Sequence, residues 1–266
     1  MFRTVTGLGV GAFILATCIT LGVGSLFASE KEAIQEEQNF IIGEYFVCDV
    51  TRENFADVLV EKALGPIYQR HVDSGELNGW GWLRHNYGGR WRRLLFATGN
   101  DLDTMMATRT AILEEQQTEN PDDFREFMSI CGSHDDLIWS QTAGQEATTP
   151  DNLGPVSYST YYACNQAGQA RADEIVQQLF APHINALVES GQITTWSWYS
   201  HVIGGRFRRL MTYSGMSHSE LIDAVNTYSG AASAENQAMA NEFNQICSSH
   251  QDYLWERVLP NPDGGG

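Results

Sequence analysis

One phrase occurs twice in this chain, as HNYGGRWRRL at residues 85–94 and as HVIGGRFRRL at residues 201–210. The offset between the two is 201 − 85 = 116 residues, and other pairs keep that offset without a gap. They include Tyr45 with Tyr161, Pro66 with Pro182, Trp80 with Trp196, Trp82 with Trp198, Cys131 with Cys247, His134 with His250 and Trp139 with Trp255. So many matches at one offset indicate an internal duplication with a period of domain size. We therefore expect two similar folded units.

Each copy predicts the same order of elements. The first copy predicts a strand at 45–50, a helix over 53–74 and two strands around Gly88-Gly89. A proline should split the first helix, and a glycine should end it. These residues are Pro66 and Gly75 in the first copy, and Pro182 and Gly191 in the second.

The second part of each copy predicts helices followed by a last strand. Asp101 and Ser217 are expected N-caps, because Ser217-His218-Ser219-Glu220 forms a capping box. A further helix should end near Cys131 or Cys247, and a short strand should hold Trp139 or Trp255. The resulting order, β-α-β-β-α-(α)-β, is the split βαβ or ferredoxin-like unit.

Two ferredoxin-like units in tandem resemble the dimeric α/β-barrel superfamily, in which two such sheets pack face to face. The resemblance covers about residues 44–257 and rests on element order, without a family motif. It implies an α+β fold in which the copies form a pseudo-twofold α/β barrel. The superfamily includes cofactor-free monooxygenases, haem enzymes and binding proteins, so the resemblance implies a small apolar ligand between the sheets without naming one.

The expected division of the chain follows from the repeat. Its segments are 1–28 (signal peptide or anchor), 29–43 (acidic lead-in), 44–140 (first repeat), 141–159 (polar linker), 160–257 (second repeat) and 258–266 (disordered tail).

The amino terminus predicts export. A short positive start precedes residues 4–28, which carry no charge, and Ser25-Leu26-Phe27-Ala28 resembles a signal-peptide cleavage site. The alternative is an uncleaved anchor, because the uncharged run is long enough to span a bilayer. Either reading places the rest of the chain in the periplasm or outside the cell.

Cysteine usage agrees with export. Apart from Cys18 in the leader, the cysteines form two matched pairs, Cys48 with Cys131 and Cys164 with Cys247. One pair per copy in an oxidising compartment predicts one disulfide per copy. The alternative is a zinc site made by Cys48, Cys131, His85 and His134. We predict no metal or other cofactor, although zinc and a non-covalent haem stay open.

The formal net charge of −17 argues against nucleic acid and anionic membranes as partners. Membrane contact is expected only through residues 4–28, if they are uncleaved. The repeated arginine clusters stand out from this acidic background and predict a small apolar or anionic ligand.

Side chains alternate along a strand, so the repeated hairpin has two faces. One face carries Trp80, Trp82, Trp91 and Arg93, matched by Trp196, Trp198, Phe207 and Arg209. It predicts either a ligand pocket in which arginine holds an anion, or an ordinary core with arginine stacked on tryptophan. The other face carries His85, Arg90 and Arg92, matched by His201, Arg206 and Arg208. It predicts either a grip on a carboxylate or phosphate, or salt bridges to acids such as Asp136 and Asp252.

Weak catalytic candidates are the four repeated histidines, His85, His201, His134 and His250. No nucleophile elbow, zinc-protease motif or phosphate-binding loop is present in the sequence.

The interpretation favoured by the sequence is an exported binding or structural protein. The alternative is an exported barrel enzyme, cofactor-free or haem-dependent, that oxidises a small apolar substrate. Residues kept in both copies favour the first, because an enzyme often keeps its site in one copy only.

Overall fold

The structure is a computed structural model that describes residues 38–145 and 153–260. All described residues belong to one compact unit. The expectations for the leader, for most of the acidic lead-in, for residues 146–152 and for the last six residues lie outside the described part.

The helices and strands follow the predicted order. The first half contains β1 (Phe40–Val47), α1 (Glu53–Leu59), the π-helical η1 (Val60–Leu64), α2 (Gly65–Asp73), β2 (Gly79–Gly88), β3 (Arg93–Gly99), α3 (Leu102–Glu119), α4 (Pro121–Ile130) and β4 (Ser133–Gln145). The second half contains β5 (Val156–Ala163), the 3-10 turn η3 (Gln166–Gly168), α5 (Gln169–Ile175), the π-helical η4 (Val176–Phe180), α6 (Ala181–Glu189), β6 (Thr195–Ile203), β7 (Arg209–Gly215), α7 (His218–Glu235), α8 (Gln237–Ile246) and β8 (Ser249–Leu259).

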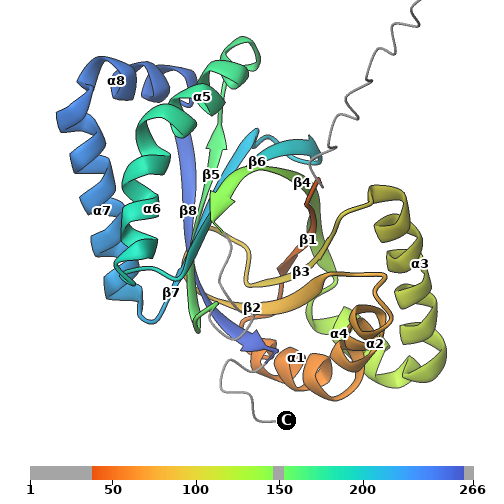
Figure 1. Cartoon of the computed structure of the whole chain (residues 1–266). Coiled ribbons are helices and arrows are strands. Elements are labelled where there is room, and N and C mark those ends of the chain that lie inside the picture. Colours follow the sequence, from red (N-terminus) through yellow and green to blue (C-terminus); the bar gives the residue numbers. More distant parts are fainter. Residues whose placement is uncertain (1–37, 146–152, 261–266) are drawn as a thin grey trace, which may run out of the picture. The chain divides into compact units, whose positions relative to one another are not determined.

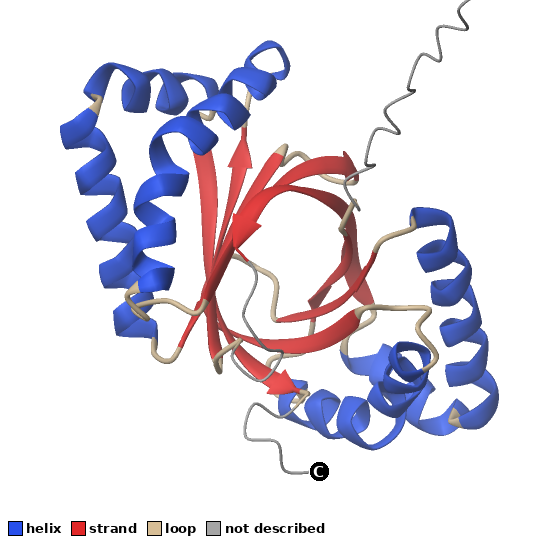
Figure 2. Cartoon of the chain, viewed as in Figure 1, coloured by secondary structure: helices blue, strands red, loops and turns tan. Residues whose placement is uncertain are grey.

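The eight strands form one closed antiparallel barrel in the order β1-β3-β2-β8-β5-β7-β6-β4. Each half contributes four consecutive strands, and the halves join where β2 pairs with β8 and β4 pairs with β6. Helices α1 to α4 and α5 to α8 cover opposite outer sides of the barrel (Figures 1 and 2). The predicted α+β fold class and pseudo-twofold barrel are confirmed, and closure leaves no free sheet edge.

The repeated Gly-Gly turns lie where the two halves pair, at the β2–β8 and β4–β6 contacts. Gly88 (φ +131°) and Gly204 (φ +97°) have backbone angles that favour glycine. A Cβ on Gly88 would lie 2.3 Å from the carbonyl oxygen of Asp252, and one on Gly204 would lie 2.1 Å from that of Asp136. Each turn therefore needs glycine because it lies against the last strand of the opposite half.

Three hydrophobic cores hold the structure. One lies between the sheet and the helices of the first half, and one lies at the same place in the second half. The third fills the barrel with Tyr45, Leu83, Trp91, Leu94, Leu137 and Trp139 and with the six residues 116 positions later, Tyr161, Tyr199, Phe207, Leu210, Tyr253 and Trp255. The repeat in the sequence is thus largely a repeat of buried positions.

The helix signals act as predicted. A π-helical turn separates α1 from α2 and α5 from α6, and Pro66 and Pro182 stand in the first turn of the second helix of each pair. Asp101 accepts a hydrogen bond from the Thr104 amide (2.7 Å), and Ser217 accepts one from the Glu220 amide (3.3 Å).

The predicted bounds of the first strand are wrong. β1 ends at Val47, whereas the sequence predicted a strand over 45–50. The Asp49 carboxylate accepts hydrogen bonds from the amide (2.9 Å) and the hydroxyl (2.7 Å) of Thr51. This local turn ends the strand and leads into α1.

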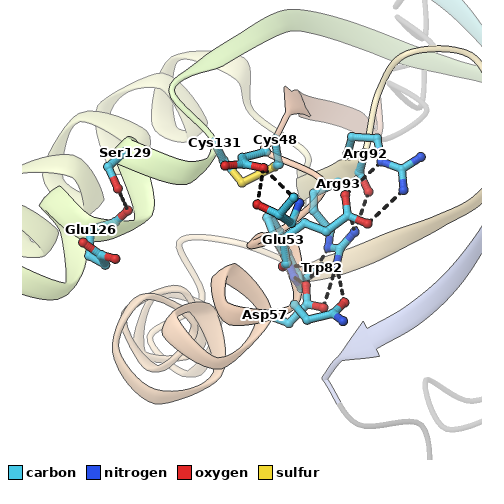
Figure 3. Close-up of a disulfide and its surroundings, with 12 residues drawn as sticks. Cys48, Glu53, Asp57, Trp82, Arg92, Arg93, Glu126, Ser129 and Cys131 are labelled. Carbon is cyan, nitrogen blue, oxygen red and sulfur yellow. Dashed lines mark hydrogen bonds and ion pairs between the residues drawn. A yellow bond between two sulfur atoms is a disulfide. The ribbon is translucent and has the colours of Figure 1, made fainter.

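Both predicted disulfides are present. Cys48 is bonded to Cys131 (Figure 3), and Cys164 is bonded to Cys247. Each bond closes a separation of 83 residues. Because these sulfurs are oxidised, they are not zinc ligands, and the two-Cys, two-His alternative is wrong. Two disulfides are typical of proteins folded in an oxidising, exported environment.

No helix within the described ranges is both long enough and apolar enough to span a bilayer.

Candidate functional site

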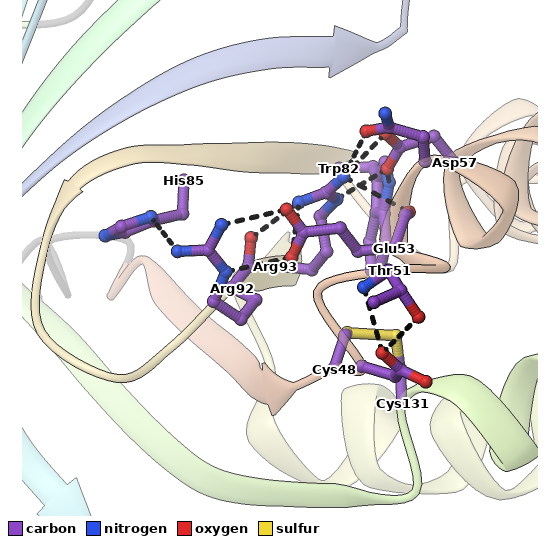
Figure 4. Close-up of polar contacts among 11 residues, drawn as sticks. Cys48, Thr51, Glu53, Asp57, Trp82, His85, Arg92, Arg93 and Cys131 are labelled. Atoms are coloured by element: carbon purple, nitrogen blue, oxygen red, sulfur yellow. Dashed lines mark hydrogen bonds and ion pairs between the residues drawn. A yellow bond between two sulfur atoms is a disulfide. The ribbon is translucent and has the colours of Figure 1, made fainter.

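The Arg93 guanidinium is fully buried between the sheet and α1 and binds the chain itself. Its Nε and Nη2 atoms donate to the two oxygens of Asp57, at 2.6 and 2.8 Å, and the Trp82 indole donates to the same carboxylate at 2.8 Å (Figures 3 and 4). Remaining donors of Arg93 bind the backbone oxygens of Arg92 and Glu53. The arginine therefore fastens helix α1 to the hairpin.

The second half repeats this arrangement. Arg209 donates to both oxygens of Asp173 at 2.6 and 2.7 Å, and the Trp198 indole donates to Asp173 at 2.8 Å. The outer tryptophans behave alike, since Trp80 donates to Gln69 and Trp196 donates to Asn185. Sequence reasoning missed Asp57 and Asp173, although they too stand 116 residues apart on the two first helices.

The contacts of Arg92 in the first half differ from those of the corresponding Arg208 in the second half. In the first half, Arg92 donates to both oxygens of Glu53 at 2.8 Å and contacts His85 Nδ1 at 2.8 Å (Figure 4). In the second half, glutamine replaces the glutamate at position 169 and binds Arg209, while Arg208 contacts the His201 ring at 3.0 and 3.1 Å. Burial lowers the pKa of both His85 and His201, so both rings are neutral near pH 7.

The aromatic residue between the arginines lies on the opposite face from the one predicted. Trp91 and Phe207 point into the barrel, where Trp91 stacks on Tyr253 at 5.0 Å. They precede β3 and β7 in irregular segments, so strand alternation does not apply to them. Arg90 pairs with Asp135, whereas Arg206 is exposed and covers the Phe207 ring at 4.8 Å.

His134 and His250, the other two candidate catalytic histidines, each lie beside an aspartate. His134 Nε2 is 3.4 Å from Asp136, and His250 Nδ1 is 3.1 Å from Asp252. The Nδ1 atom of His134 is buried without a hydrogen-bond partner among the described residues, and the His134 side chain lines a cavity.

This cavity, of about 140 Å³, lies between the sheet and the helices of the first half. Its wall is mainly apolar and contains Phe46, Val60, Leu64, Leu95, Leu113, Phe124, Phe127 and Met128. Its polar members are Glu44, Tyr68, Arg109, Gln116 and His134. A second space of about 10 Å³, large enough for one water molecule, lies beside the same Glu44 and Arg109.

An ion pair stands between the two spaces. Arg109 Nε on α3 donates to the Glu44 carboxylate on β1 at 2.7 Å, and Arg109 Nη2 is 3.8 Å from Asp136. Glu44, Arg109, Asp136 and His134 thus form a continuous polar chain along the cavity. Burial raises the pKa of Glu44, and the neighbouring Arg109 offsets this only in part. Burial also raises the pKa of Tyr68 well above its ordinary value.

The second half does not repeat this site. At the offset of 116, Glu44 corresponds to Thr160, Arg109 to Val225, and Ile112 to Tyr228. The Tyr228 hydroxyl is hydrogen-bonded to that of Tyr213, and Phe180 packs against Phe243 with ring centroids 5.0 Å apart. Larger aromatic side chains, Phe180 and Tyr228, therefore stand where the first half has Leu64 and Ile112.

Sequence reasoning missed Glu44, Arg109, Tyr68 and Gln116 as candidate site residues. The sequence did contain a signal for them, which is a difference between the copies. The first half has the charged Glu44 and Arg109 where the second half has the uncharged Thr160 and Val225. The repeated arginines, tryptophans and histidines drew attention to the shared positions instead.

The raised pKa of Glu44 predicts a pH effect on stability. The folded protein holds this proton more tightly than the unfolded chain does, for which the ordinary pKa is 4.5. Stability should therefore fall as pH rises from about that value through the raised folded pKa. In urea unfolding at several pH values between 4 and 8, the variant Glu44→Gln should lose this decline relative to wild type. Parallel pH profiles for the two proteins would contradict the assignment.

The same geometry bears on whether the chain holds a metal ion or haem. Within residues 38–145 and 153–260, no three His, Cys, Asp or Glu side chains cluster so as to hold a metal ion. His134 lines the cavity, but its Nε2 atom faces Asp136 and the volume suits one ring rather than the four pyrrole rings of a porphyrin. The described residues of this cavity do not fit haem.

Comparison with solved structures supports the fold. A candidate monooxygenase from Fusobacterium nucleatum superposes with a TM-score of 0.56 at 9% identity, covering 83% of this chain and 92% of that one. An anthrone oxidase-like protein gives 0.53 at 11% identity, covering 84% and 92%. A haem-binding protein from Thermus thermophilus gives a TM-score of only 0.43 at 9% identity, covering 83% of this chain and 91% of that one. No protein-family model and no curated protein sequence matches the chain. The likeness to the dimeric α/β-barrel superfamily is one of fold.

Proposed function

We propose that this protein binds a small molecule with a single aromatic ring and one polar substituent, in the cavity of its first half. The carrying observation is the Glu44–Arg109 pair beside a cavity of about 140 Å³, a pair that the second half replaces with Thr160 and Val225. An apolar cavity of roughly 150 Å³ accommodates benzene. The size and the polar edge together favour a phenol-like or benzoate-like ligand.

Recognition would divide between the two parts of the wall. The Phe46, Leu64 and Phe127 side chains offer apolar contact to a ring. Glu44 can accept a hydrogen bond from a ring hydroxyl, and Arg109 can donate one to an oxygen of the ligand. Because these groups are mostly buried, hydrogen bonds to them would contribute more than at the surface.

A second candidate function is oxidation of such a ring. Burial raises the pKa of Glu44, which makes it a stronger base than an ordinary carboxylate for accepting a proton from a ring hydroxyl. Arg109 would stabilise the resulting phenolate, and dioxygen would be the second substrate. The fold likeness to a candidate monooxygenase and an anthrone oxidase-like protein supports this class without establishing it.

The binding proposal can be tested with two variants. In each, residues of the first half are replaced by the residues found at the corresponding positions of the second half. Calorimetric titration with phenol, benzoate and toluene should show binding of all three to wild type. Glu44→Thr with Arg109→Val should weaken phenol and benzoate by about tenfold or more, because charged hydrogen bonds are lost, and leave toluene little changed. Leu64→Phe should abolish all three by filling the cavity.

Two results would overturn the proposal: no binding of any probe to folded wild type, or unchanged binding by Leu64→Phe. Oxygen uptake with phenols separates the two functions. Uptake that is lost in Glu44→Gln would favour the enzyme, and binding without uptake would favour the binding module.

We further propose that the chain is exported by residues 1–28, and that residues 44–140 and 160–257 are the two copies of a duplicated unit. The disulfides and the matching barrel interiors support both statements.

A further inference from the structure

The interior of the barrel is chemically divided along its length. Near the Gly-Gly turns it is filled by aromatic side chains, with Trp91 and Phe207 closing that end. Toward the other end the first half places Ile41 and Phe96 against the barrel interior. The inward positions of the second half carry small polar side chains there. Following alternation from the inward-facing Tyr161, Tyr199 and Leu210, these are Ser159 and Ser157 on β5, Ser197 on β6, and Thr212 and Ser214 on β7.

Arg257 enters this polar end from β8. It follows Tyr253 and Trp255 on the same face of the strand, and both of these are buried in the barrel. Its amide donates to the carbonyl of Pro155 at 2.7 Å, which makes Ser157 its diagonal neighbour across the strand pair. Arg257 therefore lies inside the barrel rim, next to hydroxyl groups.

No carboxylate compensates this cation within the described part of the chain. The side chain of Arg257 makes one long hydrogen bond, from Nε to the carbonyl of Gly154 at 3.4 Å. The adjacent Glu256 points outward and pairs with Arg84 at 2.8 Å. Burial lowers the pKa of Arg257. Arg257 is partly buried. An uncompensated cation in such a place is unfavourable, and it is unexpected in a chain with 33 acidic and 16 basic residues.

The fold itself does not require the charge. The position 116 residues earlier is Gln141, which follows the inward-facing Trp139 on β4. Its side chain donates to Ser197 Oγ at 3.3 Å and accepts from Asn39 at 3.0 Å. A neutral amide thus serves the same place in the first half, so Arg257 is a departure confined to one side of the barrel.

We propose that Arg257, with the hydroxyl of Ser157 beside it, binds an oxyanion inside the polar end of the barrel: the carboxylate or phosphate group of a small ligand. The guanidinium presents a planar fork that matches both groups, and the serine hydroxyl adds a donor. This site lies inside the barrel, whereas the aromatic-ring cavity lies between sheet and helices, so the two are independent.

The test uses the full exported chain, with sodium phosphate and sodium acetate as probes and sodium chloride at equal ionic strength as reference. At roughly ten times its dissociation constant, the binding anion should raise the melting temperature of wild type by about 3–6 °C. Arg257→Gln, which introduces the residue of the first half, should lose this response and should melt at or above wild type in chloride. Arg84→Gln removes the same charge from an outward position and should keep the response.

A response to phosphate alone would assign the site to phosphate groups, and a response to acetate alone would assign it to carboxylates. The proposal fails if Arg257→Gln retains the full response, because the anion then binds elsewhere. It also fails if wild type responds to neither probe and Arg257→Gln is destabilised in chloride, since Arg257 would then be satisfied by a carboxylate of the chain itself.

Discussion

Replacing Arg93 with alanine is expected to lower the free energy of unfolding by about 3–5 kcal/mol, because it leaves the Asp57 carboxylate buried without its partner. The Arg93 side chain has no exposed surface and makes four kinds of contact within the chain, to Asp57, Asn54 and two backbone oxygens. Urea unfolding followed by tryptophan fluorescence measures the loss. Arg209→Ala should cost a similar amount, because Arg209 binds Asp173 in the same way.

The matched control for this prediction is Arg90→Ala. Arg90 belongs to the same repeated phrase, but its side chain is 68% exposed and its pair with Asp135 is at the surface. Its loss should cost about 1 kcal/mol or less. If the Arg93 and Arg90 variants unfold at the same urea concentration, the proposed anchoring of α1 by Arg93 is incorrect.

Removing one disulfide is expected to have an effect of similar size. The bond between Cys48 and Cys131 closes a loop with a sequence separation of 83 residues. The loss of loop-closure entropy in the unfolded chain corresponds to about 4–5 kcal/mol for a loop of this length. The double variant Cys48→Ser with Cys131→Ser should therefore unfold at a much lower urea concentration.

The second disulfide provides an internal comparison, because Cys164 and Cys247 are separated by the same 83 residues. Its double serine variant should lose about the same stability. Adding a reductant to wild type breaks both bonds, so it should lower the unfolding midpoint further than either double variant does without reductant. A reductant that leaves the unfolding midpoint of wild type unchanged would show that the bonds are absent from the folded protein.

The repeat in the sequence predicted the fold because it marks positions at which both halves meet the same physical demands. Trp82 and Arg93 were correctly placed on one face, since the strand register around the Gly-Gly turn preserves alternation. Trp91 was misplaced because it lies in an irregular segment that turns its ring into the barrel. Alternation predicts direction only within a regular strand.

The candidate site could not be predicted in the same way, because it depends on differences between the halves. Glu44 and Arg109 come from β1 and α3 and meet only after the helix packs on the sheet. The volume of that space depends on neighbours such as Leu64, where the second half has Phe180. Such complementarity of volume among distant residues has no periodicity in the sequence.

The pairing of β2 with β8 and of β4 with β6 has a consequence for covalent integrity. Each disulfide lies within one half, so among the described residues no side-chain bond joins the halves, and the backbone between β4 and β5 links them. A protease cut there would leave two fragments that still share every strand pair of the barrel. Domain swapping is possible for the same reason: the first half of one molecule could pair with the second half of another through β2–β8 and β4–β6. A monomer and a swapped dimer would then have the same strand pairs.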